Sequence, residues 1–165
     1  MELNISELLD RDVLSRELEL KVEEKGFYYG GEYIGLLKPM DLKGTLSKEG
    51  DIFILAGKLQ CLLQLTCSRC FEKFPYAVNI PIFEKFANNS GGDEEIILLD
   101  GGVIDITEVL ENNIILNLPI KRLCKEDCKG LCQKCGTNLN YSECHCRDDD
   151  IDPRLAKLKD VFTKA

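Results

Sequence analysis

The chain has 165 residues, of which 44% are hydrophobic and 30% are charged, a balance typical of a soluble globular protein rather than a disordered or membrane-spanning one. This length suits one main domain with a small appendage. The formal net charge of −8 is divided into −10 for residues 1–120 and +2 for residues 121–165, which argues against broad, non-specific nucleic-acid binding by the acidic body.

The first half of the chain predicts strands. Glu2–Ile5 is a short strand-like run, after which Ser6 is placed to cap a helix. From Arg16 onward apolar and charged residues alternate, which is the pattern of a strand with one exposed face. Residues 33–46 and 51–65 are two longer runs joined by a glycine-containing turn, and together they predict an antiparallel hairpin.

The strand pattern continues through the middle of the chain. Residues 71–86 predict a further strand, which Pro75 and Pro81 would restrict to an edge or a bulge. A polar, glycine-rich loop at residues 88–93 then leads into a short apolar run at residues 96–99.

A helix is predicted between Asp105 and Pro119. Asp105 or Thr107 can cap its first turn, and Glu108 and Glu111 lie where the helix dipole favours anions. Its apolar face comprises Ile106, Val109, Leu110, Ile114, Ile115 and Leu118.

Together these elements predict an α+β fold around an antiparallel sheet that could close into a small barrel, with a few helices and a C-terminal zinc-binding segment. We expect an acidic α+β body at residues 1–120 and a cysteine-rich zinc segment at residues 121–150. A terminal helix beginning at Pro153 is expected within residues 151–165.

Nine cysteines carry the clearest chemical signal. The sequence has no apolar run long enough for a membrane span and no signal peptide at its N-terminus, so we expect a cytoplasmic protein with no membrane partner. In a reducing compartment closely spaced thiols are more often metal ligands than disulfides. The odd count, and the single residue between Cys144 and Cys146, also fit disulfide pairing poorly.

One four-thiolate site is predicted near the C-terminus. Cys132-Gln-Lys-Cys135 can curl around one ion, and Gly136 supplies the turn that this requires. The following loop, residues 137–143, is long enough to bring the last two cysteines back to the same ion. The site therefore comprises Cys132, Cys135, Cys144 and Cys146.

A second site is predicted around Cys67-Ser-Arg-Cys70, which needs two further ligands. Cys124 and Cys128 are spaced so that both sulfurs lie on one face of a helical turn, and their binding would pin the tail to the sheet. Alternatively, Cys124 and Cys128 could share an ion with Cys132 and Cys135. Two sites require two zinc ions, although thiolates alone do not choose between zinc and an iron–sulfur cluster.

Three other readings of these residues are weaker. Cys61 lies in a strand run and is expected to be a small buried hydrophobe. His145 could replace one ligand, but its side chain should diverge from the thiols on either side. The spacing of Cys128, Cys132 and Cys135 matches radical S-adenosylmethionine enzymes, yet only 30 residues follow Cys135, too few for the large barrel that those enzymes need.

The sequence offers little support for catalysis. It has one histidine, no glycine-rich phosphate loop and no recognisable pairing of a nucleophile with a base, and saturated four-thiolate sites are structural. We therefore expect no enzymatic activity and no small-molecule substrate. The main alternative is a zinc-dependent thiol redox switch or metal carrier, which requires an exposed, reactive thiolate.

Several motifs occur together along the chain: Cys67-Ser-Arg-Cys70-Phe71, a helix ending in Leu118-Pro119, Cys128-Lys-Gly-Leu-Cys132, Cys135-Gly-Thr-Asn-Leu-Asn140 and Asp152-Pro-Arg-Leu155. In this combination the chain resembles the YceD-like family, described as large ribosomal RNA subunit accumulation proteins. The resemblance covers essentially the whole chain. It implies a bacterial or plastid factor without enzymatic activity that is needed for normal levels of large-subunit ribosomal RNA.

The resemblance implies a non-catalytic ribosome-biogenesis factor that supports synthesis, processing or stability of this RNA. Its partner would be pre-ribosomal large-subunit RNA or a basic ribosomal or assembly protein, and the acidic body favours the protein. Any RNA contact is expected in the C-terminal part, where the basic residues could equally serve to balance the thiolate charge.

Overall fold

The computed structural model describes residues 1–5, 15–89, 96–99 and 102–146. They form two compact units. The sheet unit comprises Met1–Ser68 and Glu72–Cys124, and the cysteine unit comprises Arg69–Phe71 and the chain from Lys125 onward. The helices predicted after Ser6 and from Pro153, and most of the loop at residues 88–93, lie outside the described residues.

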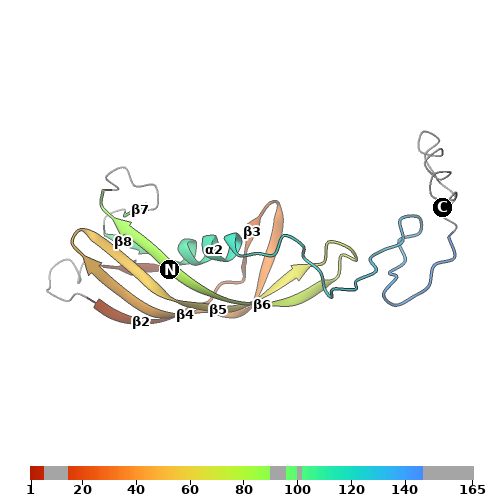
Figure 1. Cartoon of the computed structure of the whole chain (residues 1–165), viewed down its shortest axis with the longest axis horizontal. Helices are drawn as coiled ribbons and strands as arrows, with labels where there is room; N and C mark the ends of the chain where they lie inside the picture. Colours follow the sequence, from red (N-terminus) through yellow and green to blue (C-terminus); the bar gives the residue numbers. More distant parts are fainter. Residues whose placement is uncertain (6–14, 90–95, 100–101, 147–165) are drawn as a thin grey trace, which may run out of the picture. The chain divides into compact units, whose positions relative to one another are not determined.

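The sheet unit is built mainly from strands that lie side by side in Figure 1. The main sheet has the order β2 (Ser15–Val22), β4 (Glu32–Glu49), β5 (Ile52–Thr66), β6 (Lys73–Ala87) and β7 (Ile96–Leu98), and β3 (Gly26–Tyr29) pairs with the start of β4. All of these pairings are antiparallel except β6 with β7. A separate antiparallel pair joins β1 (Glu2–Asn4) to β8 (Val103–Asp105), which leads into helix α2 (Ile106–Leu116).

The sheet does not close into a barrel, and that part of the prediction is wrong. Over the described residues the outermost strands of the sheet, β2 and β7, each pair on one side only, whereas a barrel requires its first and last strands to pair with each other. The described residues also contain one helix rather than a few. The architecture is therefore an open, mostly antiparallel sheet with a single helix.

The predicted long hairpin is confirmed by the pairing of β4 with β5. Glu49 pairs with Ile52, so Gly50 lies at the turn with φ 63°, a left-handed conformation that glycine adopts without steric cost. The register shifts twice between Leu36 and Asp41, on either side of Lys38. Pro39 lies in this interval and cannot donate a ladder hydrogen bond, which accounts for an irregularity at this point.

The two prolines of β6 lie along a sheet edge, as predicted. Pro75 pairs with Gln64 and Pro81 with Lys58, in a register with β5 that runs without a bulge. The other side of β6 is paired only over residues 85–87 within the described chain. The prolines are six residues apart, so the positions at which they lack N–H groups fall on the same side of β6.

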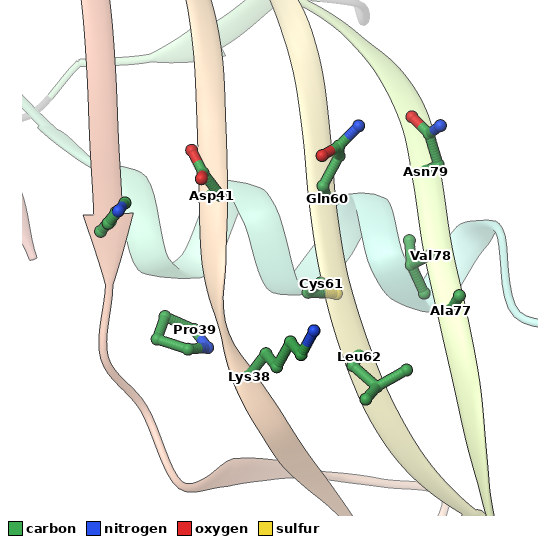
Figure 2. A pocket seen from close by; sticks show the side chains of 10 residues that line it. Lys38, Pro39, Asp41, Gln60, Cys61, Leu62, Ala77, Val78 and Asn79 are labelled. Atoms are coloured by element: carbon green, nitrogen blue, oxygen red, sulfur yellow. The ribbon is translucent and has the colours of Figure 1, made fainter.

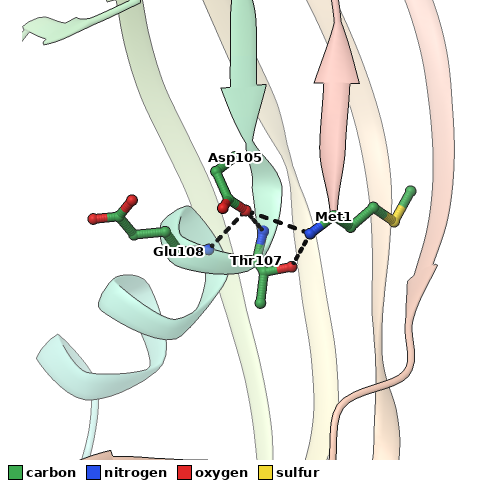
Figure 3. Close-up of polar contacts among 4 residues, drawn as sticks. All are labelled: Met1, Asp105, Thr107 and Glu108. Atoms are coloured by element: carbon green, nitrogen blue, oxygen red, sulfur yellow. Dashed lines mark hydrogen bonds and ion pairs between the residues drawn. The ribbon is translucent and has the colours of Figure 1, made fainter. Parts of the chain in front are cut away.

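Helix α2 begins as the sequence predicts. Asp105 is the N-cap, and its Oδ1 accepts hydrogen bonds from the backbone N–H groups of Thr107 (3.0 Å) and Glu108 (3.4 Å). Figure 3 shows these bonds together with the amino group of Met1, which donates to Thr107 Oγ1 at 2.6 Å. The cap therefore satisfies helix N–H groups that would otherwise lack partners.

One hydrophobic core lies between the sheet and the helix. Residues at alternate positions of β4 and β5 are buried with Ile106, Val109, Leu110 and Ile114 of α2, and Figure 1 shows the helix against one face of the sheet. Ile115 and Leu118 pack against the edge of this core, which confirms the predicted apolar face. Among the described residues, the structure contains no helix with the length and apolar character needed to cross a bilayer.

Candidate metal centres

The eight predicted ligands form two groups of four cysteines. In each group the four sulfur atoms all lie within 4.8 Å of one another. The first group comprises Cys67, Cys70, Cys124 and Cys128, and the second comprises Cys132, Cys135, Cys144 and Cys146. These groups contain the residues of the two predicted sites, and their binding of metal stays a prediction.

A small hairpin in the cysteine unit shapes the second group. Leu131 and Asn138 form an isolated antiparallel bridge, and the N–H of Cys132 donates to the carbonyl oxygen of Thr137 at 2.8 Å. Within this hairpin the N–H of Gly136 donates to the carbonyl oxygen of Cys132 at 2.9 Å. Gly136, directly after Cys135, has φ 73°. The turn predicted at this glycine is therefore present, and its conformation is left-handed.

The sulfur positions of the second group fit a tetrahedral ion. Cys144 Sγ lies 3.3 Å from Cys132 Sγ and 3.5 Å from Cys135 Sγ. An ion with four sulfurs at roughly 2.3 Å holds them about 3.8 Å apart in a tetrahedron. Only a small expansion of this cluster would therefore be required to accept zinc.

Hydrogen bonds in the second group stabilise thiolates. The backbone N–H groups of Cys135 and Lys134 lower the pKa of Cys132, the latter donating to its sulfur at 3.4 Å. The Thr137 hydroxyl, 3.1 Å from Cys135 Sγ, and the Thr137 backbone N–H lower the pKa of Cys135 to about 6. Thiolate is the form that binds a metal, so this group is partly prepared for an ion.

Cys144 has the opposite tendency. The backbone N–H of Cys146 donates to its sulfur at 3.3 Å and lowers its pKa, but hydrogen bonds with the Cys132, Cys146 and Cys135 thiols raise that pKa to about 12. Four neighbouring sulfurs cannot all ionise without a cation because their charges repel one another. A divalent ion supplies the compensating charge and displaces the remaining protons.

The residues of the first group are mostly buried. Cys67 directly follows β5, and its N–H donates to the carbonyl oxygen of Glu72 at 2.9 Å. Cys67, Cys70 and Cys128 are buried, whereas Cys124 is partly exposed. Phe71 follows Cys70 with φ 59°, a left-handed conformation that is uncommon for a bulky residue.

The two Cys-x-x-Cys segments therefore share one backbone feature. In each segment the residue directly after the second cysteine is left-handed, with Gly136 in one and Phe71 in the other. An aromatic residue held in this conformation costs of order 1 kcal/mol or more, which surrounding structure must offset. A left-handed turn at this position lets a Cys-x-x-Cys segment curl around one ion.

Cys128 has polar neighbours that the sequence interpretation did not identify as supporting residues. Asn140 Nδ2 donates to Cys128 Sγ at 3.4 Å, and Arg69 Nη1 donates to the Cys128 carbonyl oxygen at 2.7 Å. Asn140 lies in the Cys135-Gly-Thr-Asn-Leu-Asn140 motif, and Thr137 of the same motif contacts Cys135. Asn140 and Thr137 of this motif were therefore the sequence signal for the contacts with Cys128 and Cys135.

Two other sequence predictions can be compared with the structure. Cys61 is buried in the sheet unit, and burial raises the pKa of its thiol to about 11, which confirms its interpretation as a small hydrophobe. His145 is exposed and belongs to neither group of clustered ligand atoms. Its predicted divergence from the neighbouring thiols agrees with this placement.

Comparisons with known proteins point to one family. The profile described as "Large ribosomal RNA subunit accumulation protein YceD" matches residues 55–162. An uncharacterized protein of Mycobacterium tuberculosis is 34% identical over 134 residues, covering 78% of this chain and 63% of that protein. The uncharacterized protein YlbN of Bacillus subtilis is 28% identical over 134 residues, covering 76% of each chain.

A plant protein also shares a shorter region. The "Large ribosomal RNA subunit accumulation protein YCED homolog 1, chloroplastic" of Arabidopsis thaliana is 39% identical over 55 residues, which are 33% of this chain and 17% of the plant protein. No solved structure gives a significant match. The chain spans 59% to 63% of the length of the mycobacterial relatives it matches.

Proposed function

This chain belongs to the YceD family, and from that premise we propose that it is a non-catalytic ribosome-biogenesis factor acting in the cytoplasm. Its role is to support the accumulation of large-subunit ribosomal RNA through synthesis, processing or stability of that RNA. The family match over residues 55–162 is the observation that carries this proposal. The plant relative whose name states the same role supports it.

Zinc has a structural role in this proposal. One ion is bound by Cys67, Cys70, Cys124 and Cys128, and a second by Cys132, Cys135, Cys144 and Cys146. The proximity of the four sulfurs in each group and the left-handed turns after Cys70 and Cys135 support this assignment. Bound zinc supplies cross-links between segments of chain, and four thiolates leave no open position for catalysis.

The partner is pre-ribosomal large-subunit RNA or a basic ribosomal or assembly protein, and no small-molecule substrate is required. Both partner classes are consistent with the role stated in the family description. A factor of this kind acts by binding and positioning, so its activity resides in an interaction surface rather than in reactive side chains.

Deletion of the gene in the organism that encodes this chain tests the role directly. We expect the ratio of large-subunit to small-subunit ribosomal RNA to fall and to recover when the chain is expressed from a plasmid. Quantitative electrophoresis of total RNA gives this ratio. An unchanged ratio in the deletion strain would refute the proposed role.

The alternative function is a zinc-dependent thiol redox switch or metal carrier. The exposure of Cys135 and Cys146 favours it, because an oxidant or an acceptor protein could reach these sulfurs. A chromogenic zinc chelator distinguishes the two functions after treatment with mild peroxide. Zinc that stays bound through this treatment would exclude the switch and leave the structural role.

A further inference from the structure

The two faces of the main sheet differ in what covers them. One face packs against α2, and the other, which we call the open face, is covered by no element of the described chain. The strand register aligns its residues in rows, such as Lys21, Asp41, Gln60 and Asn79 across β2, β4, β5 and β6. Figure 2 shows Asp41, Gln60 and Asn79 side by side on neighbouring strands, with α2 behind the sheet.

The open face is basic although the body of the chain is acidic. Residues 1–120 hold 11 basic and 21 acidic side chains. The register places six lysines on this face but only four carboxylates, Glu17, Glu19, Asp41 and Glu49, of which Glu19 is paired with Lys43. The lysines are Lys21, Lys38, Lys43, Lys58, Lys73 and Lys85.

This separation of charge by face has a consequence for binding. A polyanion would meet a local excess of positive charge on the open face, while the remaining surface repels it. The open face therefore suits a phosphate backbone, although the net charge of residues 1–120 is negative.

Exposed aromatic rings accompany the lysines. Tyr28 of β3 and Tyr33 of β4 are cross-strand partners on the open face with ring centroids 5.1 Å apart, and Tyr28 is 77% exposed. Phe83 of β6 lies on the same face and is 63% exposed. Exposed rings on a sheet beside cationic side chains provide stacking surfaces for unpaired bases.

A hollow of about 440 Å³ lies among these groups and offers hydrogen bonds. Lys21, Lys38, Asp41, Gln60 and Asn79 all contribute to its lining. Asp41 Oδ1 is buried and has no hydrogen-bond partner in the described structure. Carboxylate and amide groups can accept from and donate to the edge of a base, so the polar side chains that line this hollow suit a nucleotide site.

We propose that the open face of the sheet binds single-stranded RNA, with its lysines contacting phosphates, its exposed rings stacking on bases and the Asp41 hollow receiving one base edge. The proposal rests on the proposed function and names the partner of that function. An acidic protein could also use the lysines, but it would leave the exposed rings and the Asp41 acceptor without a role. Unpaired RNA uses all three features.

Fluorescence anisotropy with labelled single-stranded RNA dodecamers of A, C, G or U tests this with the full, zinc-loaded chain. Replacing Lys21, Lys38 and Lys58 together by Gln should weaken binding about tenfold or more and make the slope of log affinity against log salt shallower by about 2. Tyr28→Ala should weaken binding about fivefold or more through lost stacking. Asp41→Asn should change the ranking of the four oligonucleotides.

The matched control replaces Lys121, Lys125 and Lys129 by Gln, which changes net charge equally outside the open face. Binding that falls only in this control places the contact in the C-terminal part and overturns the proposal. Absence of RNA binding, or capture of an acidic protein in its place, also overturns it. If the open-face variant restores ribosomal RNA in the deletion strain as well as the unaltered chain does, the proposal fails while the proposed function stands.

Discussion

The sheet unit and the cysteine unit differ in what is buried inside them. The sheet unit contains a continuous hydrophobic core that joins alternate residues of β4 and β5 to one face of α2. In the described part of the cysteine unit, Cys70 and Cys128 are the only buried hydrophobic side chains. The first unit has the apolar burial that normally drives folding, whereas the second does not.

This difference assigns different physical roles to the cysteines and the apolar residues. A segment of this size without an apolar core cannot offset the conformational entropy of ordering its backbone. The cysteine unit orders four sulfurs around one point and adds hydrogen bonds to them from Thr137, Lys134 and Cys146. Metal binding is the contribution that would complete its folding.

The largest effect is expected from Cys132→Ser. Metal binding contributes roughly 10 kcal/mol or more to folding in small zinc units, so loss of one ligand should unfold the part of the cysteine unit that carries the second group, residues 132–146. Mass spectrometry of metal content should show loss of about one of two zinc ions, and limited proteolysis should cut within residues 132–146. The circular dichroism of the sheet should persist.

Cys61→Ala is the control for this variant, because Cys61 is buried in the sheet unit and belongs to neither group of clustered sulfurs. It should keep both zinc ions. Full zinc content in Cys132→Ser would show that the ligand set is wrong.

Phe53→Ala should instead weaken the sheet unit. Phe53 is almost fully buried in the core, and truncation of such a ring costs about 3–5 kcal/mol. Urea unfolding followed by circular dichroism measures this loss. Phe83→Ala removes the same ring from an exposed position of the same sheet and should change stability by less than about 0.5 kcal/mol.

Zinc content under native conditions gives a second measurement for Phe53→Ala. The variant should keep both ions while its sheet remains folded. Release of zinc before the sheet unfolds would contradict the division between the two units.

Local patterns account for the parts of the fold that the sequence predicts. The β4–β5 hairpin follows from two alternating runs around Gly50, and the start of α2 follows from Asp105 ahead of a helical apolar pattern. The prediction missed β3, although Gly30-Gly31 between two aromatic runs is a signal for a two-residue turn. The prediction of barrel closure was wrong because closure depends on the pairing of distant edge strands. The alternation of apolar and polar residues along a strand does not encode that pairing.

The candidate sites show the same limit. Cysteine spacing predicts each Cys-x-x-Cys pair because that geometry is local. The joining of Cys67 and Cys70 to Cys124 and Cys128, and the contacts of Asn140 and Arg69 with Cys128, depend on the folded path of the chain. The net charge of residues 1–120 was also a poor guide to the charge of individual surfaces. It describes residues 1–120 as acidic, but the strand register places lysines such as Lys21 and Lys58 together on one face.

A smaller effect should come from the helix cap in the sheet unit. Asp105→Ala removes the acceptor for the N–H groups of Thr107 and Glu108 and should cost about 1 kcal/mol. Asp105→Asn keeps a capping oxygen and should recover most of this stability. Thermal unfolding of both variants measures the difference. Equal losses in the two variants would indicate that the charge of Asp105, rather than its capping oxygen, stabilises α2.

The smallest effect is expected at Glu111. It concerns the pH dependence of stability, which should differ between the sheet unit and the cysteine unit. Partial burial, followed by the nearby carboxylates of Glu24, Asp105 and Glu108, raises the pKa of Glu111 above its ordinary value. The folded state then holds its proton more tightly than the unfolded state, so ionisation of Glu111 lowers stability as the pH rises above about 4.5.

Glu111→Gln should therefore stabilise the sheet unit at pH 7, by less than ~0.5 kcal/mol because solvent screens the interaction, and should have no effect below pH 4. Thermal unfolding at the two pH values measures this difference, with Glu23→Gln, an exposed position in the same unit, as a control for removing one charge. Zinc binding has the opposite pH dependence because protons compete with the metal for thiolates. Acid should therefore release metal from the cysteine unit. In the sheet unit, acid should remove the loss of stability that ionised Glu111 causes. A gain for Glu111→Gln that persisted at pH 4 would show that the carboxylate charge is not its cause.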